Sequence, residues 1–273
     1  MTGIQKVIKY LAIAFAIFLT FNIIFGIMYG ISSIGILFDN NKSNISDNQN
    51  NLEINNNTLL LDINVSSSNI IIKKGDNFIA QTSSKYINCK QDNNKLYIIE
   101  KKHNWFNTNK NNELIIYVPS DFTFDRVIID AGAGKVNIEE LSTKELYLSF
   151  GAGKAEINNL EVLENAEIEG GAGDLIIDAI NINNLELNMG IGKLSLTSKL
   201  TGKNKIDSGI GEINLSLLGT EEDYEIYMDK GLGKATINGN NVKDDNTYGN
   251  GINKIDINGG IGNIEINFKN SKD

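Results

Sequence analysis

Apolar and polar residues alternate through most of the chain, and glycines interrupt the alternation at nearly regular intervals. Alternation with a period of two is typical of strands with one buried face. Between Gly132 and Gly262 the unit Gly-apolar-Gly recurs, with first glycines 19, 20, 19, 19, 22 and 29 positions apart. A repeat of this size predicts coils that stack on one another. The glycine pairs are Gly132 and Gly134, Gly151 and Gly153, Gly171 and Gly173, Gly190 and Gly192, Gly209 and Gly211, Gly231 and Gly233, and Gly260 and Gly262.

Aligning the repeats shows which positions face the core. Three positions before each first glycine the residue is always apolar: Ile129, Leu148, Ile168, Leu187, Ile206, Met228 and Ile257. The alternation changes phase across the second glycine, which predicts a bend there. Only glycine adopts positive φ without a Cβ penalty, so we expect the glycine pairs to form coil corners where neighbouring coils approach closely. The sequence therefore predicts an all-β fold, a β-solenoid of about 19–20-residue coils over residues 126–268, followed by a tail at 269–273.

Residues 58–125 precede the regular repeats and also alternate. The run Val65 to Ile72 is interpreted as a degenerate coil in which Ser66, Ser67 and Ser68 replace the glycine corner. Pro119, the only proline, ends a strand before the first regular coil. We expect this region to be an N-terminal β cap with hairpin character that covers the open end of the solenoid.

Two outward polar rows accompany the repeat. Two positions before the first glycine stand Asp130, Ser149, Glu169, Asn188, Asp207, Asp229 and Asn258, and after the second glycine stand Lys135, Lys154, Asp174, Lys193, Glu212, Lys234 and Asn263. Such rows fit a cation-binding or glycan-binding face. The favoured interpretation is a solvated face, because mixed-sign charge on a sheet surface serves solubility and prevents edge pairing.

Residues 10–38 are almost entirely apolar and long enough to cross a bilayer. Lys6 and Lys9 precede them and Asp39 follows, which predicts a single-pass anchor in the cell membrane, with residues 1–9 cytoplasmic and the C-terminal domain extracellular. The alternative is a signal peptide cleaved near Ser32, which the length of the apolar run disfavours. The Asn-rich residues 39–57 are predicted to be a disordered tether.

Composition excludes several kinds of site. The net charge of −9 and the pI near 4.8 argue against a nucleic-acid partner. One histidine and one cysteine leave no disulfide and no His-rich or Cys-rich metal site, and Cys89 is interpreted as incidental. Gly170 to Asp174 resembles the start of a calcium-binding nonapeptide, but Leu175 stands where aspartate is required. We expect no metal and no cofactor.

No catalytic constellation stands out. Carboxylates are frequent, but nothing in the pattern predicts the convergent pair in a cleft that glycoside hydrolysis requires, and Arg126 is the only arginine. We therefore predict that the chain is not an enzyme, with a polysaccharide-active enzyme as the least favoured alternative. The irregular segment Lys101–Asn107 holds His103, Trp105 and Phe106, which are candidate partner contacts or an aromatic cap on the solenoid end.

Leu96-Tyr97-Ile98, the strand from Leu114 to Pro119 and the iterated Gly-Ala-Gly-Lys/Asp coils resemble the bacterial putative-adhesin family of unknown function. The resemblance covers about Leu59 to Phe268 and implies a right-handed, non-catalytic β-solenoid. Some anchored members are encoded with Gram-positive envelope-stress systems. The resemblance thus implies a binding or accessory role in the cell envelope, with an envelope protein or a cell-wall polymer as partner. An adhesin or structural wall-attachment protein is the alternative.

Overall fold

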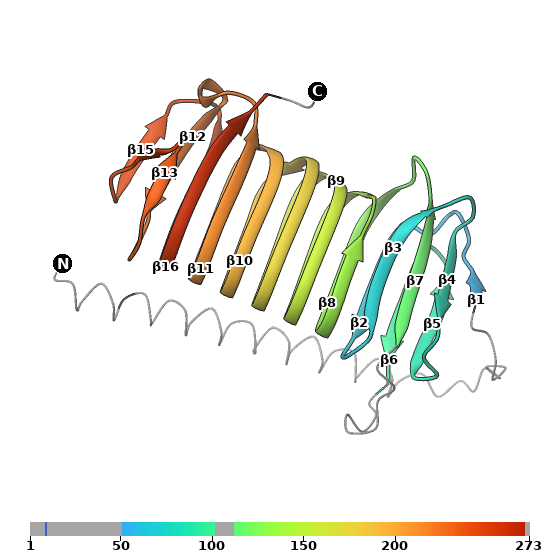
Figure 1. Ribbon diagram of the computed structural model, residues 1–273. Coiled ribbons are helices and arrows are strands. Elements are labelled where there is room, and N and C mark those ends of the chain that lie inside the picture. Colours follow the sequence, from blue (N-terminus) through green and yellow to red (C-terminus); the bar gives the residue numbers. More distant parts are fainter. Residues whose placement is uncertain (1–8, 10–50, 102–111, 271–273) are drawn as a thin grey trace.

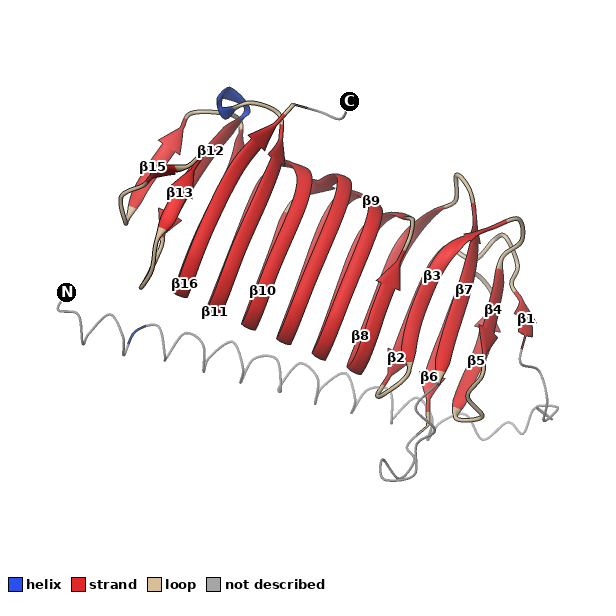
Figure 2. Cartoon of the chain, in the orientation of Figure 1, coloured by secondary structure: helices blue, strands red, loops and turns tan. Residues whose placement is uncertain are grey.

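The computed structural model describes Lys9 and residues 51–101 and 112–270. From Asn51 onward the described chain is all-β, with one 3-10 helix, η2 (Glu221–Asp223) (Figure 2). The strands of the N-terminal part are β1 (Asn51–Glu53), β2 (Leu60–Val65), β3 (Asn69–Gly75), β4 (Ile79–Thr82), β5 (Ile87–Asp92), β6 (Lys95–Glu100) and β7 (Glu113–Pro119). The others are β8 (Thr123–Ile138), β9 (Leu141–Asn183), β10 (Leu185–Thr201), β11 (Lys203–Leu218), β12 (Tyr224–Asp229), β13 (Ala235–Ile237), β14 (Asn240–Asn241), β15 (Asn246–Gly249) and β16 (Asn253–Lys269).

The middle of the structure is a solenoid-like stack of parallel coils (Figure 1). Strands β8, β9, β10 and β11 pair in parallel, and each pairing runs through the corner, so that Ala133 lies opposite Ala152 and Gly192 opposite Gly211. Strand β9 alone continues for 43 residues through more than one coil. The strands form one sheet network that does not close on itself.

The core consists of inward-facing aliphatic columns. The seven residues three positions before the first glycines are all 0% exposed. Since full burial of one such side chain contributes about 1.5–3 kcal/mol, these columns are the main stabilising element of the stack.

The order of the coils in space differs from their order in the chain at both ends. The last coil, β16, pairs in parallel with β11 on one side and with β12 and β13 on the other, so it lies between two coils that precede it. At the opposite end, β2 and β3 lie between β8 on one side and β6 and β7 on the other. Gly231 lies in the outermost coil, and the 29-residue spacing to Gly260 includes the end strands β14 and β15 before the chain returns as β16.

Antiparallel strands cover both ends of the stack. Strand β4 pairs with β7, β1 with β4, and β5 with β6, while β15 pairs with β12 and β14 with β13. These short strands shield the parallel edges, which would otherwise invite pairing with other chains. Strand β1 also corrects the predicted tether 39–57, because residues 51–53 are paired and Ile54 is 6% exposed.

The corner glycines are required by contact between backbones. A Cβ on Gly153, Gly173, Gly192, Gly211, Gly262 or Gly233 would overlap the carbonyl oxygen of the second glycine in the adjacent coil. The same residues have φ between 133° and 158°, which side-chain-bearing residues rarely adopt. Ser66 and Ser68 occupy this corner in the β2–β3 coil, where their carbonyl oxygens face Gly132 and Gly134.

Glu100 completes the serine corner. Its carboxylate accepts backbone N–H bonds from Ser66 (2.8 Å), Ser67 (2.9 Å) and Ser68 (3.3 Å), and hydroxyl bonds from Ser67 and Ser68 (both 3.1 Å). Glu100 ends β6, which pairs with β2 in the outermost coil, so its carboxylate supplies acceptors that a regular corner in that coil would present. Glu100 is 6% exposed.

Within the described residues, no helix is long and apolar enough to span a membrane. The predicted anchor, residues 10–38, lies outside the part of the chain that the structure describes, as do residues 271–273 of the predicted tail.

Replacing Gly192 or Gly211 with valine should lower the free energy of unfolding by about 3 kcal/mol or more, because the side chain meets backbone that has no room to move. The measurement is urea denaturation. Ile191→Val is the matched control, since Ile191 lies between Gly190 and Gly192 but is 56% exposed, and it should change stability by about 0.5 kcal/mol or less. Equal stability of all three variants would show that the corners can open.

Replacing Glu100 with alanine should destabilise the protein by about 3 kcal/mol, because three backbone donors lose a charged acceptor in a buried place. Glu139→Ala, at an exposed turn, is the control. Hydrogen exchange at Ser66 to Ser68 gives the local readout: it should accelerate in Glu100→Ala more than exchange at the corner Gly190 to Gly192. Uniform acceleration along the stack would contradict a local capping role.

Candidate functional site

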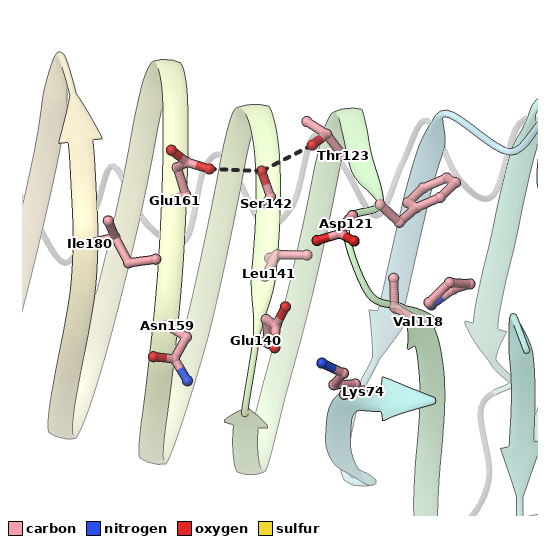
Figure 3. Close-up of a pocket in the computed structure, with 12 residues that line it drawn as sticks. Lys74, Val118, Asp121, Thr123, Glu140, Leu141, Ser142, Asn159, Glu161 and Ile180 are labelled. Carbon is pink, nitrogen blue, oxygen red and sulfur yellow. Dashed lines mark hydrogen bonds between the residues drawn. The ribbon is translucent and has the colours of Figure 1, made fainter. Parts of the chain in front are cut away.

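A groove of about 470 Å³ runs along one edge of the coils in the N-terminal half of the stack (Figure 3). We call it the edge groove. One wall is the row Thr123, Ser142 and Glu161, and the other is the row Asp121, Glu140 and Asn159. Leu141 lies between the rows with 1% exposure and contributes to the floor. A volume of this size is within the range of small-molecule sites.

The coil register builds the groove. Thr123 lies opposite Ser142, and members of each row are 19 positions apart in the chain. Because stacked strands lie about 4.8 Å apart, such residues form rows along the stack, while the inward residue between the rows faces the core. Asp121 (φ 62°) and Asn159 (φ 47°) adopt left-handed conformations that aspartate and asparagine tolerate, at the turns between coils.

Larger side chains lie at both ends of the groove. Lys74, Val118, Pro119 and Phe122 line one end, and Ile180, which is 53% exposed, lines the other. Ile180 lies in an irregular stretch, since the pairing of β9 with β10 shifts register between Thr197 and Lys199. The groove therefore spans three coils and offers apolar surface at each end.

The polar walls have distinct chemistry. The Ser142 Oγ lies 3.2 Å from the Thr123 Oγ1 and donates a 3.3 Å hydrogen bond to the Glu161 Oε2, which links three coils. Six carboxylates elsewhere on the coils pair with lysine or arginine, while others, such as Asp174, Glu186 and Glu265, form no ion pair with the described residues. The pairs are Asp125 with Lys144, Glu145 with Arg126, Glu156 with Lys154, Asp207 with Lys205, Glu212 with Lys193 and Glu225 with Lys254. Among the described residues, Asp121, Glu140 and Glu161 have no such pairing. The groove lining holds three carboxylates and one ammonium group, that of Lys74, so its net charge is negative.

A second, more open groove of about 560 Å³ crosses the face before the glycine corners. Its walls carry Arg126, Lys203 and Lys205 together with Glu145, Glu167 and Glu186. The cationic and acidic side chains balance in number, so this surface lacks the negative charge of the edge groove.

The outward row before the corners alternates in charge along the stack. In spatial order it reads Asn64, Asp130, Ser149, Glu169, Asn188, Asp207, Asn258 and Asp229. The inserted coil places Asn258 between Asp207 and Asp229, and the Asn258 Nδ2 donates to the Asp207 Oδ1 at 2.8 Å. Each acid thus has neutral neighbours in its row, which avoids repulsion between like charges on adjacent strands.

Burial nevertheless raises the pKa values of two acids in this row. Asp130 is 3% exposed, and its Oδ1 has no hydrogen-bond partner among the described residues. Burial, with the nearby charges of Asp62 and Glu169, raises the pKa of Asp130 to about 6. Burial and Glu167 raise the pKa of Glu169, and burial and Glu169 raise that of Tyr147.

The middle residues of the corners form a row along the outside of the stack. In spatial order they are Ala133, Ala152, Ala172, Ile191, Ile210, Ile261 and Leu232. Each is at least partly exposed, and the row changes from alanine to larger aliphatic residues toward the C-terminal coils.

The predicted contact residues His103, Trp105 and Phe106 lie outside the described residues. Asn112, the first described residue after them, accepts a 2.9 Å hydrogen bond from the Asn69 N–H beside the serine corner. Cys89 lies on β5, and burial raises the pKa of its thiol to about 11. The part of the chain that the structure describes contains no group of three or more His, Cys, Asp or Glu placed to hold a metal.

Lys9 lies close to the C-terminal part of the stack. Its Nζ is 2.8 Å from the Asp229 Oδ2. If residues 10–38 span a bilayer, Lys9 and Asp229 lie on opposite sides of it, so this contact and the predicted anchor exclude each other.

A family model described as Toastrack DUF4097 matches residues 58–271, which is most of the chain. The chain belongs to the Toastrack DUF4097 family. The Toastrack domain covers the stack, the edge groove and both covered ends. A search of curated proteins finds no match. Among solved structures, the Toastrack chain is similar to a putative cell adhesion protein from Clostridium sporogenes, with 18% identity, 80% of this chain and 98% of that chain covered, and a TM-score of 0.38.

The raised pKa of Asp130 predicts that the free energy of unfolding depends on pH. Its pKa is higher in the folded than in the unfolded Toastrack domain, so the folded state binds the proton more tightly and loses stability as pH rises from about 4 through about 6. Asp130→Asn should raise the free energy of unfolding by about 2 kcal/mol at pH 7.5 and leave it unchanged at pH 4. Urea denaturation at both pH values measures this. Asp174→Asn, at an exposed position, should show no such difference; equal effects of the two variants would contradict the assignment.

Proposed function

We propose that this chain is a non-catalytic binding or accessory protein of the bacterial cell envelope. Residues 10–38 anchor it in the cell membrane with the N-terminus in the cytoplasm, and the Toastrack domain lies outside. The proposal extends to the envelope-stress response and to a right-handed coil, both of which rest on the family resemblance. In this arrangement the Lys9–Asp229 contact is not made.

The edge groove is the observation that carries the proposal. Its walls come from paired parallel coils whose backbones touch at the corners, so the positions of its polar groups are set by the register of the stack. A site fixed in this way binds without the ordering cost of a flexible loop. Hydroxyl, amide and carboxylate groups with apolar ends suit recognition of a polar ligand.

The length of the predicted tether limits the distance between the Toastrack domain and the membrane. With β1 beginning at Asn51, residues 39–50 remain between the predicted anchor and the fold, and a flexible chain of this length spans roughly 20 Å. The domain would then stay close to the extracellular surface of the cell membrane. This favours a membrane-proximal partner over a distant surface.

Cross-linking in intact cells tests the proposal. A membrane-impermeant cross-linker should capture a membrane or envelope protein with the full-length chain. Residues 1–50, which keep the predicted anchor and lack the Toastrack domain, are the matched control and should not capture it.

Three outcomes would overturn parts of the proposal. Recovery of cell-wall polymer alone would replace the accessory role with that of an adhesin or structural wall-attachment protein. Equal capture by residues 1–50 would remove the domain from the interaction. Turnover of purified wall polysaccharide by the full-length chain would show that it is an enzyme.

A further inference from the structure

We infer that the stack lies along the membrane surface on its corner edge, with the corner residues from Ile191 to Leu232 in contact with the lipid interface. The corner edge is the edge formed by the coil corners, from the serine corner to the corner at Leu232. The inference rests on the proposed anchor at residues 10–38 and deepens the proposed function by giving the orientation of the Toastrack domain. Three observations carry it: where the chain enters the fold, the apolar row on the corner edge, and the balance of charge beside that row.

The chain enters the fold from the corner edge. Through β4 and β7, Asn51 is level with Ile71 of β3, which is three residues beyond Ser68 of the serine corner. The same pairings place Glu53, the last residue of β1, level with Lys73, further from the corner. Strand β1 therefore runs away from the corner edge, and the chain before it arrives from that edge, about 10 Å from the corner. Residues 39–50, which span roughly 20 Å, thus join the corner edge to the predicted anchor.

The corner edge carries an apolar row whose larger members lie far from the tether. The middle residues of the corners are alanines in the three coils next to the serine corner, and Ile191, Ile210, Ile261 and Leu232 in the four that follow. Ile191 is 56% exposed and the other three are partly exposed. At about 4.8 Å per coil, Ile191 lies roughly 19 Å from the serine corner and Leu232 roughly 34 Å. Strands β1 and β13 lie at opposite ends of the stack (Figure 1), so these residues offer a second contact at the end that the tether does not hold.

Charge beside the larger aliphatic residues is balanced. The charged residues that flank these four corners are Lys193, Lys230 and Lys234 together with Asp207, Asp229 and Glu212. Three lysines and three acids leave no net charge, so an anionic lipid surface is neither attracted nor repelled there. A neutral apolar ridge suits the interface of a bilayer, where aliphatic side chains leave water while the flanking charged groups stay at headgroup level.

The short tether lets a weak contact suffice. A flexible linker of this length gives an effective concentration in the millimolar range, so a surface contact with a dissociation constant of about 1 mM would be made about half the time. Four aliphatic side chains that each remove part of their surface from water supply a contact of this order. At the tethered end the anchor itself keeps the stack at the membrane, so the small alanine corners suffice there.

In this orientation the edge groove opens away from the membrane. Residues 123–131 and 135–138, both within β8, lead from the corner at Gly132 to the groove residues Thr123 and Glu140. From Gly134 to Glu140 an extended chain covers roughly 20 Å, so the groove is held about that far above the lipid surface. A membrane-proximal partner could then reach the groove while the corner edge rests on the lipid.

Fluorescence from single labelled cysteines in the full-length protein tests the orientation. The protein is reconstituted into phosphatidylcholine vesicles, with Cys89→Ser as background and a nitrobenzoxadiazole label at Ile191→Cys or Ile180→Cys. Ile191 and Ile180 are a matched pair, because they are 56% and 53% exposed but lie on the corner edge and beside the edge groove. Quenching by spin-labelled lipids at position 191 should exceed that at position 180 at least about threefold, because only the corner edge enters the interface. Emission at position 191 should also shift to shorter wavelength.

Matched double variants locate the contact. Ile210→Ser with Ile261→Ser removes apolar surface from the corner row, and quenching of a label at Leu232→Cys should fall at least about threefold. Ile180→Ser with Leu163→Ser removes more exposed aliphatic surface away from the corner row and should leave that quenching unchanged. Thermal melting of both variants shows that the fold is kept.

Several results would overturn the inference. Equal quenching at positions 191 and 180, greater quenching at position 180, or unchanged quenching in the corner variant would each contradict the orientation. A wavelength shift at position 191 without lipid quenching would show that a second copy of the chain, and not lipid, covers the row.

Carbonate extraction of the same vesicles separates this result from failure of the proposed anchor. A chain that stays in the vesicles with an unquenched label at position 191 refutes the orientation and leaves the anchor standing. A chain that alkaline carbonate extracts refutes the anchor, and the orientation with it.

Discussion

Direct contact between backbones at the coil corners is the constraint on which the rest of the structure depends. The second glycine of each corner meets the carbonyl oxygen of the second glycine in the next coil, at a φ that only glycine adopts readily. That contact fixes the register of successive coils. Register then places aliphatic residues over aliphatic residues in the core, separates acids with neutral residues in the outward row, and aligns the two walls of the edge groove.

The sequence predicts the regular coils well because their information is local and repeated. Alternation sets which side chains face inward, and the spacing of the glycines sets the corners, including the serine corner at Ser66 to Ser68. The order of the terminal coils is not local information, since Gly231 and Gly260 carry the same corner signal whichever lies next to Gly209. The outward polar row does contain one hint of the spatial order. If the coils stacked in chain order, Asp207 and Asp229 would lie side by side, whereas insertion of the coil with Asn258 separates the two acids.

The sequence does not predict the edge groove, for a related reason. Its walls are made of single residues that are 19 positions apart and belong to no motif, so nothing in a short window predicts that Thr123, Ser142 and Glu161 share a wall. The sequence instead points to His103, Trp105 and Phe106, because rare aromatic residues in a polar segment are conspicuous. Those residues lie outside the described part of the chain, and Glu100 already satisfies the backbone donors of the serine corner. Capping of those donors therefore does not require the aromatic residues.

If residues 39–50 tether the fold to a membrane, as proposed, insertion of the β2–β3 coil has a mechanical consequence. Strand β2 is hydrogen-bonded along both edges, to β6 and to β8, so tension applied through the tether cannot peel it from the end of the stack. It must shear two parallel pairings together, after the pairing of β1 with β4 and the backbone hydrogen bonds of Ile54 with Phe78 and of Leu59 with Asn94 have been released. The edge groove is lined mainly by residues at the starts of β8 and β9 and their turns, and Lys74 of β3 and Val118 and Pro119 of β7 line its end at the doubly held coil. A pull on residues 39–50 would therefore reach the groove only after the pairings of β2 with β6 and with β8 had broken.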